Sequence, residues 1–199
     1  MDYRAAGLIL SSYLAGGIPA GYLIVRRLKG FDIRERGSGN PGTANVYRMA
    51  GPLAGALTLT VDALKGYLPV LLAQRCYPGS LVPMLCGSAA VIGHDWTVFL
   101  SFRGGKGVAT SGGVFAALMP KAVACAAAVF AAGFAASGHI SVGSMAAAAA
   151  LPLISFCFGE PLSLTFLAIA SALLIFYKHI PNIERLMARK ELHLSEKKY

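Results

Sequence analysis

Two glycine-rich polar segments of this chain combine backbone amides with cations, a combination that suits phosphate binding. The first, residues 37–48, reads Gly-Ser-Gly-Asn-Pro-Gly-Thr-Ala-Asn-Val-Tyr-Arg. Its glycines fit G-x-G-x-x-G, but a dinucleotide site needs a preceding strand in a βαβ unit, and an apolar helical segment precedes this one. Exposed amides, the side chains of Ser38 and Asn40, and a two-bond clamp by Arg48 would suit a phosphate. The alternative is a capped loop leading into the next helix.

The second segment, residues 93–110, contains Gly104-Gly105-Lys106-Gly107 directly before a predicted helix. It is not a Walker A loop, which needs Gly at Leu100 and Ser or Thr at Gly107. Glycine amides and a lysine at the positive end of a helix dipole still make a phosphate cradle. The alternative is an interfacial turn with a snorkelling lysine. His94 is a further candidate here; its neighbour Asp95 points elsewhere on a helix, so capping at the interface is favoured over an acid–base pair.

A third polar segment, residues 178–186, follows the last apolar run and begins Lys-His-Ile-Pro-Asn. Pro181 should end the preceding helix, which leaves His179 and Asn182 at the membrane surface. The imidazole is a candidate base or phosphate ligand, and the alternative is a helix cap. Within an earlier apolar run, Asp62 and Lys65 share a helix face, and we expect a bracing ion pair in preference to direct catalysis.

The composition identifies the elements that must position these segments as membrane helices. Of 199 residues, 56% are hydrophobic and only 14% charged, with a mean hydropathy of +0.61, which excludes soluble globular, disordered and collagen-like chains. The cysteines stand singly, so neither a zinc site nor a disulfide framework is indicated. Without an acidic cluster suited to magnesium, we predict no metal and no cofactor, and EDTA should leave activity intact.

Seven apolar segments predict a single all-α domain, residues 1–199, built as a polytopic membrane helical bundle of about seven transmembrane helices, some short. The first exceeds the core length of a signal peptide. The third and fourth are short enough to be tilted or re-entrant, and five spans result if short segments merge. The expected spans are 5–25, 51–73, 81–92, 108–119, 122–136, 142–158 and 161–177.

The positive charges gather in three places that an odd number of spans puts on one face. Of 18 Lys and Arg residues, 14 lie in residues 26–48, 103–106 and 178–198. Because Lys and Arg collect in short cytoplasmic loops, we expect the N-terminus outside, the C-terminus inside and the polar segments on the cytoplasmic side. The net charge of +9 is thereby assigned to orientation and anionic ligands, and no nucleic acid partner is expected.

Together these motifs resemble the bacterial acyl-phosphate:glycerol-3-phosphate acyltransferase family. The resemblance runs from Phe31 to Leu186 and rests on the segment at 37–48, Asp62-x-x-Lys65-Gly66, the segment at 93–110, and His179-x-x-Asn182-Ile183-x-Arg185-Leu186. It implies an inner-membrane enzyme of phospholipid synthesis that moves a fatty acyl group from acyl phosphate to the sn-1 hydroxyl of glycerol 3-phosphate, giving lysophosphatidic acid and phosphate.

The resemblance also implies the roles of individual residues. It implies functional roles for Ser38, Arg48, Gly104, Gly105, Lys106, Gly107, His179 and Asn182, and we expect Ser38, Arg48, Lys106, His179 and Asn182 to be the catalytic set. As further substrate ligands, we expect Asn40, Thr43, Asn45, His94 and Ser141. Two positions depart from the family pattern, since Thr43-Ala44 reverses its usual Ala-Thr order, and Pro181 stands where an acidic residue is common. The expected partners are the two substrates and membrane lipids, with no obligate protein partner.

Two other functions remain open at this point. The five-residue spacing of His179 and Glu184 is similar to that in acyltransferases that use acyl-CoA, although an aspartate is expected there. A small phosphate or lipid transporter could use short broken helices as gates, although the chain shows no internal repeat. The proton acceptor is also open between His179 and a phosphate oxygen of the substrate.

Overall fold

A computed structural model describes residues 2–194, and this part of the chain is all helical, as the apolar patterns predict. The chain divides into two compact units, one up to residue 117 and the other from residue 118 onward. The α-helices are α1 (Tyr3–Gly17), α2 (Ala20–Lys29), α3 (Thr43–Ala50), α4 (Pro52–Cys76), α5 (Val82–Asp95), α6 (Val108–Leu118), α7 (Pro120–Ser137), α8 (Ile140–Cys157), α9 (Leu162–Lys178) and α10 (Ile180–Met187).

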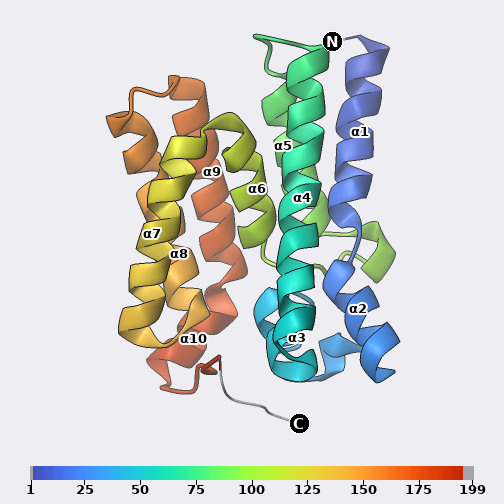
Figure 1. The fold of residues 1–199 in the computed structure, drawn as a ribbon, viewed down its shortest axis with the longest axis vertical. Coiled ribbons are helices and arrows are strands. Elements are labelled where there is room, and N and C mark those ends of the chain that lie inside the picture. The colour runs from blue at the N-terminus through green and yellow to red at the C-terminus, as the bar shows by residue number, and fades with distance from the viewer. Residues whose placement is uncertain (1, 195–199) are drawn as a thin grey trace. The chain divides into compact units, whose positions relative to one another are not determined.

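In the first unit, α1, α4 and α5 run side by side, with the short helices α2 and α3 at one end of α4 (Figure 1). Glycines permit this close packing of apolar helices without bulky side chains between them. A Cβ at Gly16 would collide with the backbone of Ala90 on α5, and one at Gly113 on α6 would collide with the backbone of Ala63 on α4. The helices that carry the polar segments are therefore fixed backbone against backbone.

The first predicted span is broken into α1 and α2, which the apolar pattern did not reveal. Pro19 cannot donate a backbone hydrogen bond, so the helix stops at Gly17 and restarts at Ala20. The break releases carbonyl groups that side chains then use: Thr97 Oγ1 donates to the Gly17 carbonyl at 2.6 Å, and Lys65 Nζ donates to the Ile18 carbonyl at 2.9 Å. Irregular backbone is tolerated inside an apolar bundle only when it is satisfied in this way.

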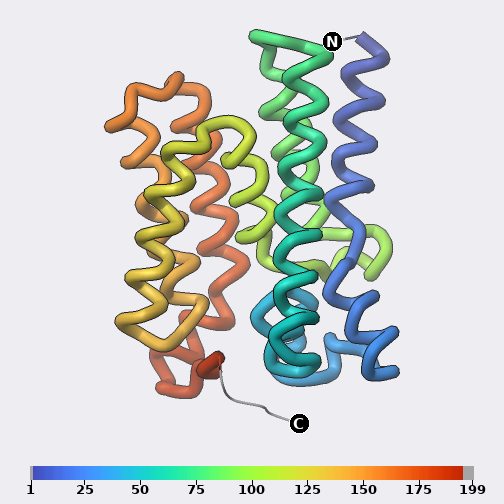
Figure 2. Tube along the Cα trace, in the orientation of Figure 1, coloured from blue at the N-terminus to red at the C-terminus, as the bar shows by residue number. Residues whose placement is uncertain are grey.

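In the second unit, α7, α8 and α9 form consecutive antiparallel neighbours, and α10 follows α9 after a bend of 55° (Figure 2). Pro181 lies near the start of α10, in the first turn, where its missing N–H is tolerated. The predicted break after α9 is therefore present, but the chain resumes as a short helix. Residues 190–194 then leave α10 without helical structure.

All seven predicted apolar segments are helical, but they differ in their ability to cross a membrane. By length and apolarity, four described spans are long enough, namely Tyr3–Lys29, Pro52–Cys76, Pro120–Ser137 and Ile140–Cys157. A fifth is present if the bent pair α9 and α10 counts as one span. With 14 and 11 residues, α5 and α6 are shorter than a full crossing requires, as their sequences suggested.

Candidate functional site

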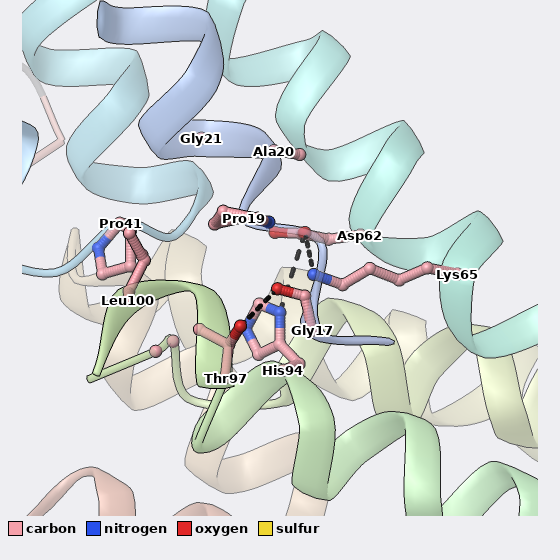
Figure 3. Close-up of a pocket in the computed structure, with 12 residues that line it drawn as sticks. Gly17, Pro19, Ala20, Gly21, Pro41, Asp62, Lys65, His94, Thr97 and Leu100 are labelled. Carbon is pink, nitrogen blue, oxygen red and sulfur yellow. Dashed lines mark hydrogen bonds and ion pairs between the residues drawn. The ribbon is translucent and has the colours of Figure 1, made fainter. Parts of the chain in front are cut away.

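The first unit contains a buried cluster of charged side chains beside the break between α1 and α2 (Figure 3). Lys65 Nζ lies 2.8 Å from Asp62 Oδ1, which confirms the predicted ion pair within α4. His94, in the last turn of α5, places Nδ1 3.7 Å from the same carboxylate oxygen. All three residues are at least nine-tenths buried. One carboxylate thus connects a lysine and a histidine from two helices inside an apolar body.

His94 in turn shapes the loop with the sequence Gly104-Gly105-Lys106-Gly107. Its carbonyl accepts a hydrogen bond from the Gly105 amide at 3.0 Å, and a Cβ at Gly105 would collide with Nε2 of its ring. A Cβ at Gly104 would collide with the His94 carbonyl, and Gly107 has a φ of +73°, which favours glycine. His94, in the last turn of α5, therefore packs against the glycine loop and holds its backbone in place.

The loop leads directly into α6 and carries Lys106, which is half-buried. The Ser111 amide donates to the Gly107 carbonyl at 2.7 Å and closes the first turn. The predicted placement of glycine amides and a lysine at a helix N-terminus is thus present in the structure. Such a terminus presents backbone donors and the positive end of the helix dipole to an anion.

The first polar segment is a loop braced by Asn45 on α3. The buried Asn45 side chain accepts from the Ser38 amide at 3.0 Å and donates to the Arg36 carbonyl at 3.0 Å. Asn40 Oδ1 accepts from the Gly42 amide at 2.8 Å, which turns the chain into α3. These bonds give both asparagines a structural role in the loop, and their contact with substrate stays a prediction.

Just before this loop, Asp32 and Arg34 form a salt bridge. Arg34 Nη2 lies 2.6 Å from Asp32 Oδ2, and Arg34 Nη1 donates to the Leu100 carbonyl of the second segment at 3.4 Å. The hydrogen bonds from Arg34 lower the pKa of the Asp32 carboxyl below its ordinary value, against a smaller opposing effect of burial. The turn just before the first polar segment is therefore linked to the second segment within one unit.

Of the remaining predicted residues of the first segment, Ser38 lies in the loop before α3, and Thr43 and Arg48 lie on α3. Arg48 is buried, Ser38 is half-buried, and Thr43 occupies the first position of α3. Among the described residues, the buried hydroxyl of Thr43 has no hydrogen-bond partner, and the same is true of Thr110 and Ser111 in the first turns of α6. Buried hydroxyls normally have partners, so these three are available to a ligand.

One pocket joins the two polar segments with the buried charges (Figure 3). It is lined by Pro41 of the first segment, by Gly104 and Gly105 of the second, by Asp62, Lys65 and His94, and by the broken backbone around Pro19. The structure thus brings together segments that are about sixty residues apart in the sequence. Sequence reasoning did not foresee that the break between α1 and α2 would line this pocket.

The third polar segment belongs to the second unit. His179 forms the junction of α9 and α10, and its Nδ1 lies 2.8 Å from the Ile175 carbonyl. Because a carbonyl can only accept, Nδ1 carries the hydrogen, so in the neutral form of the ring the lone pair is on Nε2. The backbone amide of Asn182 donates to the backbone carbonyl of His179 at 2.8 Å. The predicted pair His179 and Asn182 is therefore adjacent in the structure.

A carboxylate that sequence reasoning missed, Glu191, meets two predicted residues of this unit. Ser141 Oγ at the start of α8 donates to Glu191 Oε1 at 2.9 Å, and Asn182 Nδ2 donates to the same oxygen. Arg185 Nε donates to Oε2 at 2.7 Å. The only signal in the sequence was an acidic residue in a basic tail, which did not reveal a contact across fifty residues.

The family model described as glycerol-3-phosphate acyltransferase matches residues 6–189 of this chain. A glycerol-3-phosphate acyltransferase of Trichlorobacter lovleyi is 47% identical over 188 residues, covering 94% of this chain and 96% of that protein. The chain belongs to the glycerol-3-phosphate acyltransferase family. The match includes all three polar segments, which confirms the family resemblance derived from their motifs.

Two solved structures of this family share the fold. The glycerol 3-phosphate form of PlsY, an integral membrane glycerol 3-phosphate acyltransferase, has a TM-score of 0.91 at 38% identity, covering 96% of this chain and 95% of that chain. The lysophosphatidic acid form has a TM-score of 0.88 at 37% identity with the same coverage. The protein is therefore an integral membrane acyltransferase of this family, and its family activity belongs to phospholipid biosynthesis.

Proposed function

We propose that this acyltransferase transfers a fatty acyl group from an acyl phosphate to the sn-1 hydroxyl of glycerol 3-phosphate, giving lysophosphatidic acid and phosphate. The observation that carries the proposal is the glycine loop before α6, which is packed on His94 and lines one pocket with the first polar segment. The solved relatives, in their glycerol 3-phosphate and lysophosphatidic acid forms, support the acceptor and the product.

The proposed donor site uses the loop from Gly104 to Gly107. Both substrates carry phosphate groups with up to two negative charges each, so the enzyme must supply amides and cations in place of carboxylates. The loop amides and Lys106 bind the acyl phosphate at the N-terminus of α6. His94 holds the backbone of the loop in place, and Asp62 and Lys65 brace His94 from α4.

The proposed acceptor residues bind glycerol 3-phosphate. In the first unit these are Ser38, Asn40, Thr43 and Arg48, of which Arg48 supplies the charge and the unpartnered Thr43 hydroxyl supplies a donor. In the second unit, Asn182 and Ser141 are the residues that we propose as substrate contacts. The arginine is the group best suited to hold a phosphate through two parallel bonds.

Little covalent chemistry is required of the protein, because an acyl phosphate is already activated. The sn-1 oxygen attacks the acyl carbonyl carbon, the bond from that carbon to the phosphate oxygen breaks, and the hydroxyl proton passes to a base. Positioning and stabilisation of the oxyanion therefore supply most of the rate. The base is either His179 Nε2, which holds the lone pair of the ring, or a phosphate oxygen of the substrate, whose second pKa is about 6 by analogy with phosphorylated residues.

Purified protein supplied with glycerol 3-phosphate and either acyl phosphate or acyl-CoA tests the proposal. We expect lysophosphatidic acid only with acyl phosphate, with one phosphate released per product. Product formed from acyl-CoA, or phosphate flux through liposomes without acyl transfer, would overturn it. His179→Gln then separates the bases: full turnover across the pH range excludes the imidazole, and loss of turnover with intact substrate binding supports it.

We also propose that the protein lies in the bacterial inner membrane with its active site on the cytoplasmic side. The distribution of Lys and Arg supports this orientation. The test introduces Ser38→Cys into a variant of the protein from which the native cysteines have been removed. In intact cells this cysteine should not react with a membrane-impermeant thiol reagent, and after lysis it should react. Labelling in intact cells would reverse the assignment.

A further inference from the structure

The last turn of α2 carries three exposed cations, Arg26, Arg27 and Lys29. Within residues 2–194, none of the three forms an ion pair with a carboxylate, and Arg26 donates one hydrogen bond to a backbone carbonyl. The next carboxylate along the chain, Asp32, is already paired with Arg34 at 2.6 Å. The positive charge of this turn is therefore not neutralised by a salt bridge in the described part of the chain.

The length of the first span places these cations at the level of the lipid headgroups. The span Tyr3–Lys29 has 27 residues, which corresponds to about 40 Å of helix. The hydrocarbon core of a bilayer is only about 30 Å thick, so both ends of the span extend beyond it. Arg4 marks one membrane surface and the last turn of α2 marks the other.

The inner face of α2 is packed against the protein, which leaves its outer face to the lipid. Val25 is completely buried in an apolar cluster, and a Cβ at Gly21 would collide with the Pro41 carbonyl. On the outer face, Leu23 and Leu28 are each more than half exposed. Leucines beside cations are typical of a helix end at the membrane interface, where the apolar groups enter the acyl region and the cations reach the headgroups.

We propose that the last turn of α2 binds the headgroups of anionic phospholipids through Arg26, Arg27 and Lys29. Charge complementarity favours this ligand, because residues 26–36 contain five Lys and Arg residues and only two carboxylates. The inference goes beyond the proposed function and does not depend on it, since it requires only that the protein is integral to a membrane.

The surface is separate from the pocket in which we place the substrates. Ala20 and Gly21, at the other end of α2, line that pocket, whereas the three cations are not among its lining residues. A lipid is favoured over a soluble phosphate because the exposed leucines beside the cations can contact acyl chains, which a soluble phosphate lacks. The expected ligand is therefore a phospholipid with a net negative headgroup.

Lipid quenching of a fluorophore on α2 tests the proposal. Leu23→Cys, in a variant without the native cysteines, carries the fluorophore, and the protein is placed in lipid nanodiscs. Brominated phosphatidylglycerol and brominated phosphatidylcholine are compared at the same mole fraction, because each quenches in proportion to its local concentration. We expect the anionic lipid to be enriched about 5-fold or more, the factor that one cation at an anionic surface provides. Replacing the three cations of α2 by glutamine should bring the enrichment close to one.

A matched control removes the same charge elsewhere. Arg4→Gln, Arg75→Gln and Lys121→Gln together replace three other exposed cations and should keep the enrichment at α2. Arg26→Lys with Arg27→Lys keeps the charge and should also keep it, which separates lost charge from poor folding. Equal quenching by the two lipids around the unmodified α2 cations would overturn the proposal. So would loss of the enrichment on adding glycerol 3-phosphate at constant ionic strength, because the cations would then bind a soluble phosphate.

Discussion

The glycine loop of the first unit and the Glu191 cluster of the second are fixed in opposite ways. The loop from Gly104 to Gly107 is held by backbone contact, since a side chain at Gly104 or Gly105 would collide with His94. The Glu191 cluster is held by side-chain hydrogen bonds to a segment that follows the last helix. An added side-chain atom should therefore disturb the glycine loop, whereas loss of the negative charge of Glu191 should disturb its cluster. Substitutions should therefore affect the two regions differently.

We expect the largest effect, a loss of stability, from breaking the buried ion pair between Asp62 and Lys65 in the first unit. Asp62→Asn leaves the buried Lys65 ammonium without its counter-ion, and breaking such a pair costs about 3–5 kcal/mol of stability. The midpoint of thermal unfolding in detergent measures the loss. Replacing both residues, as Asp62→Asn with Lys65→Met, should recover much of the stability because no charge remains buried. A single variant as stable as wild type would show that the pair does not brace this region.

The second effect tests whether the glycine loop depends on close backbone packing. Gly105→Ala places a Cβ against the His94 ring, and displacement of the loop by about 1 Å should reduce kcat/KM about 100-fold. Gly112→Ala on α6 is the matched control, because a Cβ there meets nothing within 4 Å. It should keep full activity. Equal activity of both variants would mean that the His94 contact does not set the geometry of the loop.

This difference between backbone contacts and long-range side-chain contacts also explains which features could be predicted from the sequence. The helices and the ion pair of Asp62 with Lys65 depend on local spacing, and both are present as predicted. The glycine loop is visible as a motif because its backbone demands glycine. The contact from Ser141 to Glu191 joins residues fifty apart through side chains, and no local pattern encodes it. The break at Pro19 was missed because its neighbours are uniformly apolar, so the hydropathy stayed continuous.

Replacement of Thr43 should have a smaller effect, on the KM for glycerol 3-phosphate. It tests whether the Thr43 hydroxyl contacts the substrate or has only a structural role. Its buried hydroxyl has no partner among the described residues, so Thr43→Ala should raise the KM for glycerol 3-phosphate about 3- to 10-fold, the value of one hydrogen bond. Thr43→Ser should restore it. Thr58→Ala is the control, because that hydroxyl already donates to the Ala54 carbonyl at 2.8 Å. An unchanged KM in Thr43→Ala would remove Thr43 from the substrate ligands.

The smallest expected effect is on the pH dependence of stability, which we compare between Glu191 and Asp32. Both carboxyls have a pKa below their ordinary values of 4.5 and 3.8, so each stabilises the fold fully above its ordinary value and loses this contribution as the pH falls through its folded pKa. The stability gap between wild type and Glu191→Gln should therefore be constant above about pH 5 and shrink below 4.5.

Asp32→Asn should show a weaker gap that shrinks only below 3.8, because the Asp32 side chain is 17% exposed, against 5% for Glu191, and the solvent screens its pair more strongly. Added salt should reduce the Asp32 gap and leave the gap at the more deeply buried Glu191 nearly unchanged. Unfolding midpoints measured at several pH values and two salt concentrations give both gaps. Equal salt dependence at the two sites would mean that the solvent screens Glu191 as strongly as Asp32, which would remove the distinction between a buried carboxylate and a more exposed salt bridge.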